Sequence, residues 1–172
     1  MKIALCGIAG SGKDYLADWL VQEQSFTKIA FADSVRKITH DLFPFIDEHY
    51  DAHDKEMKLP CGYSPRDVWI GLSNELRKYD NEIFLRHTAE KIKMTHVDNI
   101  VVTDLRDIIE YEWLEKNGYT IILIERTDKI YEPNDYDKKI LQFVDKIKFV
   151  FTNDAQGTTA FNEFLRNSCV LK

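Results

Sequence analysis

Seven residues near the start of the chain have the types and spacing needed to hold a phosphate group. Residues 7–13 read G-I-A-G-S-G-K and fit the spacing G-x-x-x-x-G-K. Glycine accepts backbone angles that other residues avoid, so consecutive N–H groups of such a loop can turn inward around phosphate oxygens. The alternative is a glycine-rich turn without a ligand. We therefore predict a phosphate-binding loop that contains Gly7, Gly10, Ser11, Gly12 and, as a source of positive charge, Lys13.

The residue that follows Lys13 is an aspartate, whereas loops of this spacing usually carry a serine or threonine whose hydroxyl binds magnesium. Asp14 could bind Mg²⁺ directly or through a water molecule, or act as an acceptor near the attacking group. In the alternative interpretation, its negative charge only stabilises the first turn of the following helix. The predicted metal shell therefore differs from the usual one.

An aspartate and an arginine follow the clearest apolar run of the chain. Residues 99–103 read N-I-V-V-T, and Asp104 and Arg106 come just past the predicted carboxyl end of this strand. Ligands of parallel sheets bind outside the carboxyl ends of the strands, so Asp104 could reach a metal that bridges phosphates, and Arg106 could neutralise phosphoryl oxygens. Glu110 lies four residues beyond Arg106 and could hold its guanidinium in place. The alternative is a helix N-cap with a surface ion pair.

Three further arginines could bind the phosphate of an acceptor molecule. Arg36 is predicted on the helix after the second strand, and Arg66 and Arg77 flank the next helical stretch. On one continuous helix, Arg66 and Arg77 would share a face but stand about 16 Å apart, too far to hold one phosphate together. A helix break at residues 71–73 (G-L-S) would change that spacing. For each arginine, an ordinary exposed helix face is the alternative interpretation.

A charged segment at residues 127–146 has the composition of a mobile lid. Arg126 ends the preceding predicted strand, and Lys129, Lys138 and Lys139 follow within the segment. A closing lid would bring such positive charges over a bound nucleotide. An ordinary exposed helix would have the same composition.

These candidate residues need a sheet whose strands end at one edge. Apolar runs predict strands at residues 2–6, 27–32, 99–103, 119–125 and 148–152. Helical spacing and terminal residues predict helices at residues 13–24, from Asp33 as N-cap to Leu42, and at 65–79, 81–94, 108–116 and 158–166. Between the helix that ends at Leu42 and the helix predicted from residue 65, residues 43–60 are predicted as an exposed loop with room for a helical turn. Strands that alternate with helices imply a three-layer α/β/α fold, with a mostly parallel central sheet and a helical excursion at about residues 33–95.

The composition favours a single domain over residues 1–172. The chain has 44% hydrophobic residues, enough for one sizeable core.

Its net charge of -6, without a run of five basic residues, argues against binding to a nucleic acid polymer. Its three cysteines are odd in number and far apart, which predicts free thiols in a reducing compartment. We expect a cytoplasmic protein with no membrane contact, because no apolar run reaches spanning length and no signal-peptide pattern is present.

On these motifs the chain resembles the phage-type deoxynucleoside monophosphate kinases, relatives of adenylate and phosphomevalonate kinases. An aspartate after the loop lysine is usual in that family. The matching segments are spread over most of the chain: G-x-x-G-S-G-K-D at residues 7–14, F-A-D at 31–33, S-P-R-D at 64–67, L-R at 76–77, V-V-T-D-L-R-x-x-x-E at 101–110, I-E-R at 124–126 and T-N-D at 152–154.

The resemblance implies a P-loop kinase that uses ATP and Mg²⁺ to phosphorylate a deoxynucleoside monophosphate. It implies a phosphoryl-transfer centre of Lys13, Asp14, Asp104, Arg106 and Glu110, with Asp14 and Asp104 as the metal-binding carboxylates. It also implies that the loop, Tyr15 and Arg126 bind ATP with Asn153 near the adenine, and that Asp33, Arg36, Arg66 and Arg77 face the acceptor. The expected partners are these two small molecules, and a homodimer is an open possibility. A phage-encoded chain would act in the host cytoplasm.

Two alternatives stay open at this point. One is a kinase of another small phosphorylated metabolite, of the phosphomevalonate or dephospho-coenzyme A type. The other is a regulatory protein that binds nucleotide without transferring phosphate. Two differences from the family motivate the second: Tyr15 stands where the family often has threonine, and residues 127–146 lack its acidic-histidine lid motif.

Overall fold

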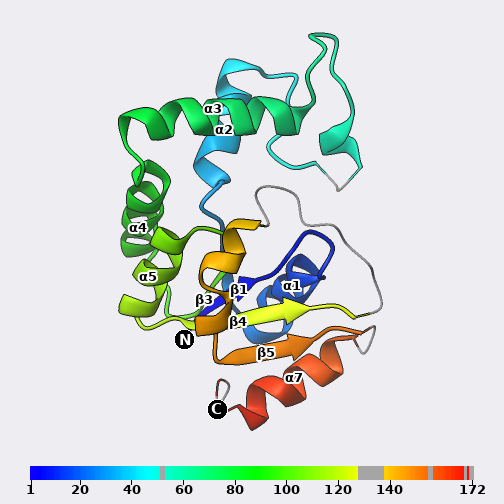
Figure 1. Ribbon diagram of the computed structural model, residues 1–172, viewed down its shortest axis with the longest axis vertical. Helices are drawn as coiled ribbons and strands as arrows, with labels where there is room; N and C mark the ends of the chain where they lie inside the picture. The colour runs from blue at the N-terminus through cyan, green and yellow to red at the C-terminus, as the bar shows by residue number, and fades with distance from the viewer. Residues whose placement is uncertain (51–52, 128–137, 155–156, 169, 171–172) are drawn as a thin grey trace. The chain divides into compact units, whose positions relative to one another are not determined.

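The chain contains two compact units in the computed structural model. The first comprises Met1–Ala30 and His96–Lys172, and the second comprises Phe31–Thr95. The structure describes residues 1–50, 53–127, 138–154, 157–168 and 170 (Figure 1). Each unit has its own secondary structure and its own side-chain contacts.

A five-stranded sheet in the order β2-β3-β1-β4-β5 forms the centre of the first unit (Figure 1). Every pair of neighbouring strands is parallel, which confirms the predicted parallel sheet. The strands are β1 (Lys2–Cys6), β2 (Thr27–Ile29), β3 (Ile100–Leu105), β4 (Thr120–Glu125) and β5 (Phe149–Thr152). All five strands occur at the predicted places in the chain.

Two predicted strand ends were wrong. β2 stops at Ile29 instead of residue 32, because the buried residues Ala30 and Phe31 belong to the turn that leads into the next helix. β3 continues to Leu105 instead of ending at residue 103, because Leu105 pairs with Cys6 of β1. Asp104 therefore lies within the paired part of β3 and not beyond the end of the strand.

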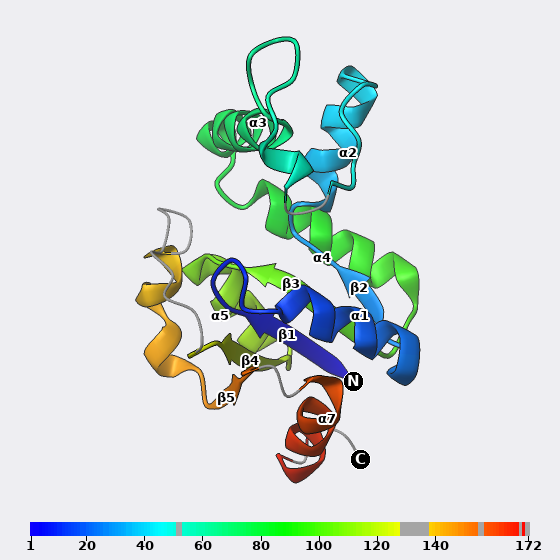
Figure 2. The ribbon, with the colours of Figure 1, turned by 90° about the vertical axis from the view of Figure 1, so that its right-hand side faces the viewer.

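The strand register brings the ends of three strands to one edge of the sheet. Cys6, the last residue of β1, is paired with Leu105 of β3 and with Leu123 of β4. The segments that follow β1, β3 and β4 consequently leave the sheet at the same edge. Figure 2 shows the loop between β1 and α1 at this edge.

Helices cover both faces of the sheet, so that the first unit has the three layers predicted. On one face, α1 (Lys13–Gln24) and α7 (Gly157–Asn167) pack over a core that includes Leu5, Leu20 and Phe161. On the other, α5 (Ile108–Lys116) packs beside the short 3₁₀ helices η2 (Lys139–Gln142) and η3 (Val144–Lys146). Tyr111 of α5 stacks on Phe143 there, with 5.0 Å between ring centroids. Successive side chains of a strand point to opposite faces of the sheet, so the same five strands contribute side chains to the core on each face.

The second unit is helical, with α2 (Asp33–Leu42), the 3₁₀ helix η1 (Asp54–Glu56), α3 (Pro65–Tyr79) and α4 (Ile83–Thr95). Its limits lie close to those predicted for the helical excursion. Ser64 and Asp67 form a reciprocal capping box at the start of α3, with Pro65 at the first helical position, as the sequence predicted for this start. α2 packs against both α3 and α4.

One prediction about these helices was wrong. Asp33 is the first residue of α2 and not its N-cap, because Ala32 already has helical backbone angles and occupies the cap position. The helix predicted at residues 65–79 is confirmed, and the break considered at residues 71–73 does not occur, because Gly71 continues the regular helix of α3. Glycine inside a helix costs backbone entropy but does not by itself interrupt the hydrogen-bond pattern.

No helix among the residues that the structure describes has the length and apolar character needed to cross a membrane.

Candidate active site

The loop at residues 7–13 lies tightly against its neighbours at two glycines. A Cβ atom on Gly7 would stand 2.5 Å from the main-chain oxygen of Ile124 in β4, and one on Gly12 would overlap Nδ2 of Asn153. Gly12 also has a φ of 86°, in the left-handed region that glycine tolerates best. A side chain at either position would thus displace the loop, which explains why the sequence carries glycine there.

The start of α1 can receive an anion. Gly12 is its N-cap and supplies no side-chain hydrogen bond, so the first N–H groups of this 12-residue helix are not capped by a side chain. The side chain of Lys13 is buried at this helix start. The hydroxyl of Ser11 is buried too and has no hydrogen-bond partner among the described residues. A bound phosphate would supply acceptors for these donors, so the loop fits the phosphates of a nucleotide.

Asp14 lies between two lysines. One of its carboxylate oxygens is 3.7 Å from Nζ of Lys13, and the other is 3.8 Å from Nζ of Lys28 on β2. Lys28 also contacts Asp18 of α1 at 2.8 Å. Lys28 was not predicted as a site residue, since a lysine in a three-residue strand has no motif of its own. Only the packing of α1 beside β2 brings it to Asp14.

Glu110 fixes the backbone at the start of α5. Its carboxylate accepts hydrogen bonds from the main-chain N–H groups of Arg106, at 3.1 Å, and Asp107, at 3.2 Å. Asp107 is the N-cap of α5, and the two residues form a reciprocal capping box. The helix N-cap that the sequence left as an alternative is thus real, and it sits directly after Asp104 and Arg106. The predicted contact of Glu110 with the Arg106 guanidinium stays a prediction.

Burial changes the acid–base properties around the end of β1. The pKa of Glu110 is raised to about 8, first by burial and then by the negative charge of Asp104, while the two backbone hydrogen bonds oppose the shift. Burial also raises the pKa of the Cys6 thiol to about 12, against the positive charges of Lys13 and Arg106. Cys6 is therefore a core thiol and not a nucleophile at neutral pH. The charges of Lys13, Arg106 and Glu110 all act on the pKa of Cys6, the last residue of β1.

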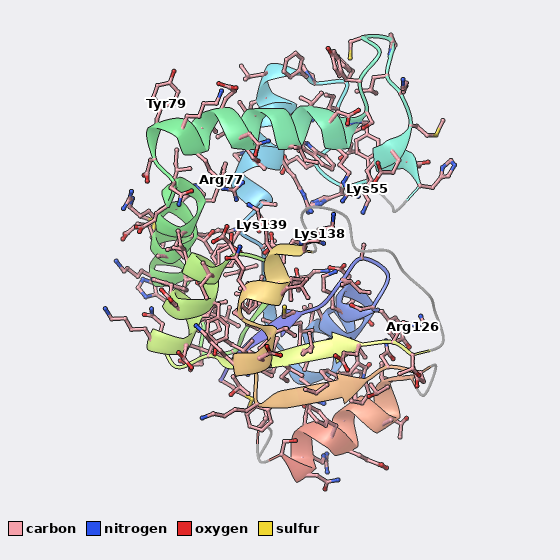
Figure 3. All side chains as sticks on the ribbon, viewed as in Figure 1. Lys55, Arg77, Tyr79, Arg126, Lys138 and Lys139 are labelled. Atoms are coloured by element: carbon pink, nitrogen blue, oxygen red, sulfur yellow. The ribbon has the colours of Figure 1, made fainter. Side chains whose placement is uncertain are left out.

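Two predicted ATP-binding residues follow β4 and β5. Asn153 lies directly after β5, and its side-chain amide donates a 2.9 Å hydrogen bond to the main-chain oxygen of Ser11 in the loop. Arg126 lies directly after β4 (Figure 3). Tyr15, on the first turn of α1, is exposed.

Half of the predicted lid falls outside the described residues, which omit 128–137 and with them Lys129. Lys138 and Lys139 are described, at the start of η2 (Figure 3). Nζ of Lys139 lies 3.6 Å from the carboxylate of Asp107. This lysine thus stands at the beginning of α5, next to the capping box. The role of the segment as a lid stays a prediction.

The four predicted acceptor residues all belong to the second unit. Arg36 lies over the ring of Trp69 at 5.5 Å and Arg77 over that of Phe84 at 4.8 Å. The other two form ion pairs within the unit, Arg66 with Glu56 at 2.5 Å and Asp33 with Lys91 at 3.1 Å.

The unbroken helix α3 limits how these arginines can act. Arg66 and Arg77 lie eleven positions apart on it, which corresponds to about 16 Å along the axis. This spacing disfavours the binding of one phosphate by both guanidinium groups.

Comparisons with known proteins agree with this geometry. No protein-family model matches the chain. A curated relative from Acanthamoeba polyphaga mimivirus is named "Putative deoxynucleotide monophosphate kinase". The two sequences are 23% identical in an alignment 185 residues long, which covers 98% of this chain and 95% of the relative. Among solved structures, shikimate kinase from Aquifex aeolicus aligns over 100% of both chains with a TM-score of 0.53 and 12% identity. The second likeness shows the fold, a three-layer P-loop kinase fold.

The chain thus has the fold of a P-loop kinase, and over nearly its whole length it is similar to a relative named as a nucleotide kinase. The predicted fold is thereby confirmed.

Proposed function

We propose that the protein transfers the terminal phosphoryl group of ATP to a deoxynucleoside monophosphate. The observation that carries the proposal is the pairing of β1 with β3, in which Cys6 stands opposite Leu105. This pairing puts the phosphate-binding loop and Asp104 at the same edge of the sheet. The mimivirus relative, which matches almost the whole chain, supports the acceptor class through its name.

The loop and Arg106 would stabilise the transferred group. Uncapped N–H groups at the start of α1 and the ammonium of Lys13 bind the phosphates of ATP, and Tyr15, Arg126 and Asn153 contribute to the nucleotide site. Arg106 neutralises charge that develops on the phosphoryl oxygens during an in-line transfer. Such a transfer needs positioning and charge stabilisation and no covalent enzyme intermediate.

The carboxylates at the site suit magnesium. Mg²⁺ usually takes one or two protein carboxylates and completes its shell with water and phosphate oxygens. Asp104 and Asp14 are the residues that would hold it. When bound, the ion neutralises negative charge between the phosphates. Asp14 additionally lies near both Lys13 and Lys28, so its charge helps to balance two cations beside the loop.

The helical unit would bind the acceptor. Arg36 and Asp33, on the first turn of α2, are the proposed contacts to the acceptor, together with either Arg66 or Arg77. A guanidinium suits a phosphate monoester because it can donate two parallel hydrogen bonds.

The test is a panel of acceptors. The protein is incubated with ATP, Mg²⁺ and each of the four deoxynucleoside monophosphates, and ADP and the deoxynucleoside diphosphates are separated by chromatography. We expect ADP and the matching diphosphate to appear in equal amounts with at least one acceptor. ADP formation without any diphosphate product would contradict the proposed acceptor. Binding of ATP with no turnover on any acceptor would contradict the transfer activity itself.

A further inference from the structure

Asn153 joins the end of β5 to the phosphate-binding loop. Its Nδ2 donates a 2.9 Å hydrogen bond to the main-chain oxygen of Ser11, a residue 142 positions earlier in the chain. Both residues are buried. Because a buried carbonyl group that loses its partner is costly, this bond favours one orientation of the peptide plane after Ser11.

The same amide packs against the next residue of the loop. A Cβ atom on Gly12 would overlap Nδ2 of Asn153, so the amide lies directly against the glycine. Asn153 thus contacts the loop at two consecutive residues, and the second of them is the N-cap of α1. The N–H groups that follow are those available to a phosphate.

Asn153 is itself held firmly in place. Its main-chain N–H donates to the oxygen of Glu125 at 2.8 Å, which extends the pairing of β4 with β5. The carboxylate of Asp154 accepts hydrogen bonds from the main-chain N–H of Thr127, at 2.9 Å, and from its hydroxyl, at 2.5 Å. These hydrogen bonds join the segments after β4 and β5. Asn153 belongs to the joined segment, and its side chain contacts the loop.

We propose that Asn153 is a positioning residue, which orients the loop for phosphate through Ser11 and Gly12 and does not act on the base of the nucleotide. The inference rests on the proposed function, because it assumes that the loop binds the phosphates of ATP. It also differs from the place near the adenine that the family resemblance implies. One of the two N–H donors of its amide is engaged with Ser11.

The test compares two ligands that share phosphates but not a base. Affinities for ADP and for sodium tripolyphosphate are measured by calorimetry on the wild-type protein and on Asn153→Ala. We expect both affinities to fall by the same factor, about tenfold, because the lost bond orients the shared phosphate site. Asn167→Ala, an exposed asparagine at the end of α7, is the matched control and should change neither affinity. A fall for ADP with unchanged tripolyphosphate binding would overturn the inference and assign Asn153 to the base.

A second pair of variants distinguishes a loss of loop positioning from a general loss of protein stability. Gly12→Ala should weaken tripolyphosphate binding strongly in the wild-type background, since a side chain at a φ of 86° is strained and the new methyl group also collides with the Asn153 amide. In the Asn153→Ala background the same change should weaken it several-fold less, because that amide is gone. Equal losses in both backgrounds would show that Asn153 does not position the loop. A wild-type protein that binds neither ADP nor tripolyphosphate would instead refute the proposed function, and this inference with it.

Discussion

At the scale of single residues, Lys13 and Asp104 occupy comparable places. Lys13 opens α1 just after β1, and Asp104 lies next to the last residue of β3. Each brings a charge to the edge where the two strands are paired. Their charges are opposite, which suits the proposed site for phosphate and a metal ion.

Removing either charge should abolish most turnover. We expect Lys13→Ala and Asp104→Asn each to lower kcat by about 100-fold or more, the usual cost of losing one electrostatic contact to a transition state. Turnover is measured with ATP and the best acceptor of the panel, and circular dichroism checks the fold. The exposed substitutions Lys116→Ala and Asp98→Asn are matched controls that should retain activity. A folded variant at position 13 or 104 with wild-type turnover would refute the assignment.

Glu110 should make the stability of the protein depend on pH. Its pKa is about 8 in the folded chain and near 4.5 in the unfolded one, so between these values the folded state binds more protons. Stability should therefore fall as pH rises from about 5 to about 8, by at most about 1.4 kcal/mol per pH unit from this group, and change no further above that range.

The glutamine variant isolates this effect. Glu110→Gln keeps an acceptor for the capping box but does not ionise, so the difference in unfolding free energy between variant and wild type should grow from about pH 5 to about pH 8. Denaturant unfolding across this range measures it. Glu112→Gln, an exposed change on the same helix, should leave the wild-type pH profile intact. A constant difference between Glu110→Gln and wild type at all pH values would contradict the raised pKa.

At the scale of elements, α3 decides how the acceptor arginines can be used. The helix begins at a capping box on Ser64 and runs without interruption past Gly71. Its continuity keeps Arg66 and Arg77 apart. A break at Gly71 would have allowed both to approach one phosphate.

Alanine at position 71 should stabilise the protein. Gly71 is exposed in the middle of α3, lacks a positive φ, and has no neighbouring atom within 4 Å of the place that a Cβ would take. Gly71→Ala should therefore raise the unfolding free energy by about 0.5–1 kcal/mol. Gly62→Ala is the contrasting control, because Gly62 has an equally open surrounding but a φ of 85° and should lose stability. Urea unfolding measures both, and a destabilised Gly71→Ala variant would indicate that α3 bends there.

At the scale of the whole molecule, nucleotide binding should stabilise the folded chain. A ligand that binds only the folded state at about 100 times its Kd adds about 2.7 kcal/mol. For a chain of 172 residues this corresponds to a rise in Tm of roughly 5–10 °C. We expect this rise with Mg-ADP in differential scanning fluorimetry and its loss in Lys13→Ala. An unmoved Tm in the wild-type protein would contradict a phosphate-binding loop.

Much of this protein was determined by local features of its sequence. The spacing of residues 7–13, the apolar runs of the strands and the periodicity of the helices are properties of neighbouring residues, and they predicted the loop, five strands and a parallel sheet. Helix starts with strong capping residues, such as Ser64, were predicted correctly for the same reason. Where a local pattern was ambiguous, as at residues 30–32, the prediction failed.

Contacts between distant parts of the chain were decided only by the tertiary structure. The hydrogen bond from Asn153 to Ser11, the approach of Lys28 to Asp14 and the burial that raises the pKa of Glu110 have no counterpart in local spacing. Each depends on the strand order β2-β3-β1-β4-β5 and on the helices that cover it. The physical reason is that burial and long-range pairing are set by which elements pack together, and a pattern of neighbours along the chain carries no measure of that packing.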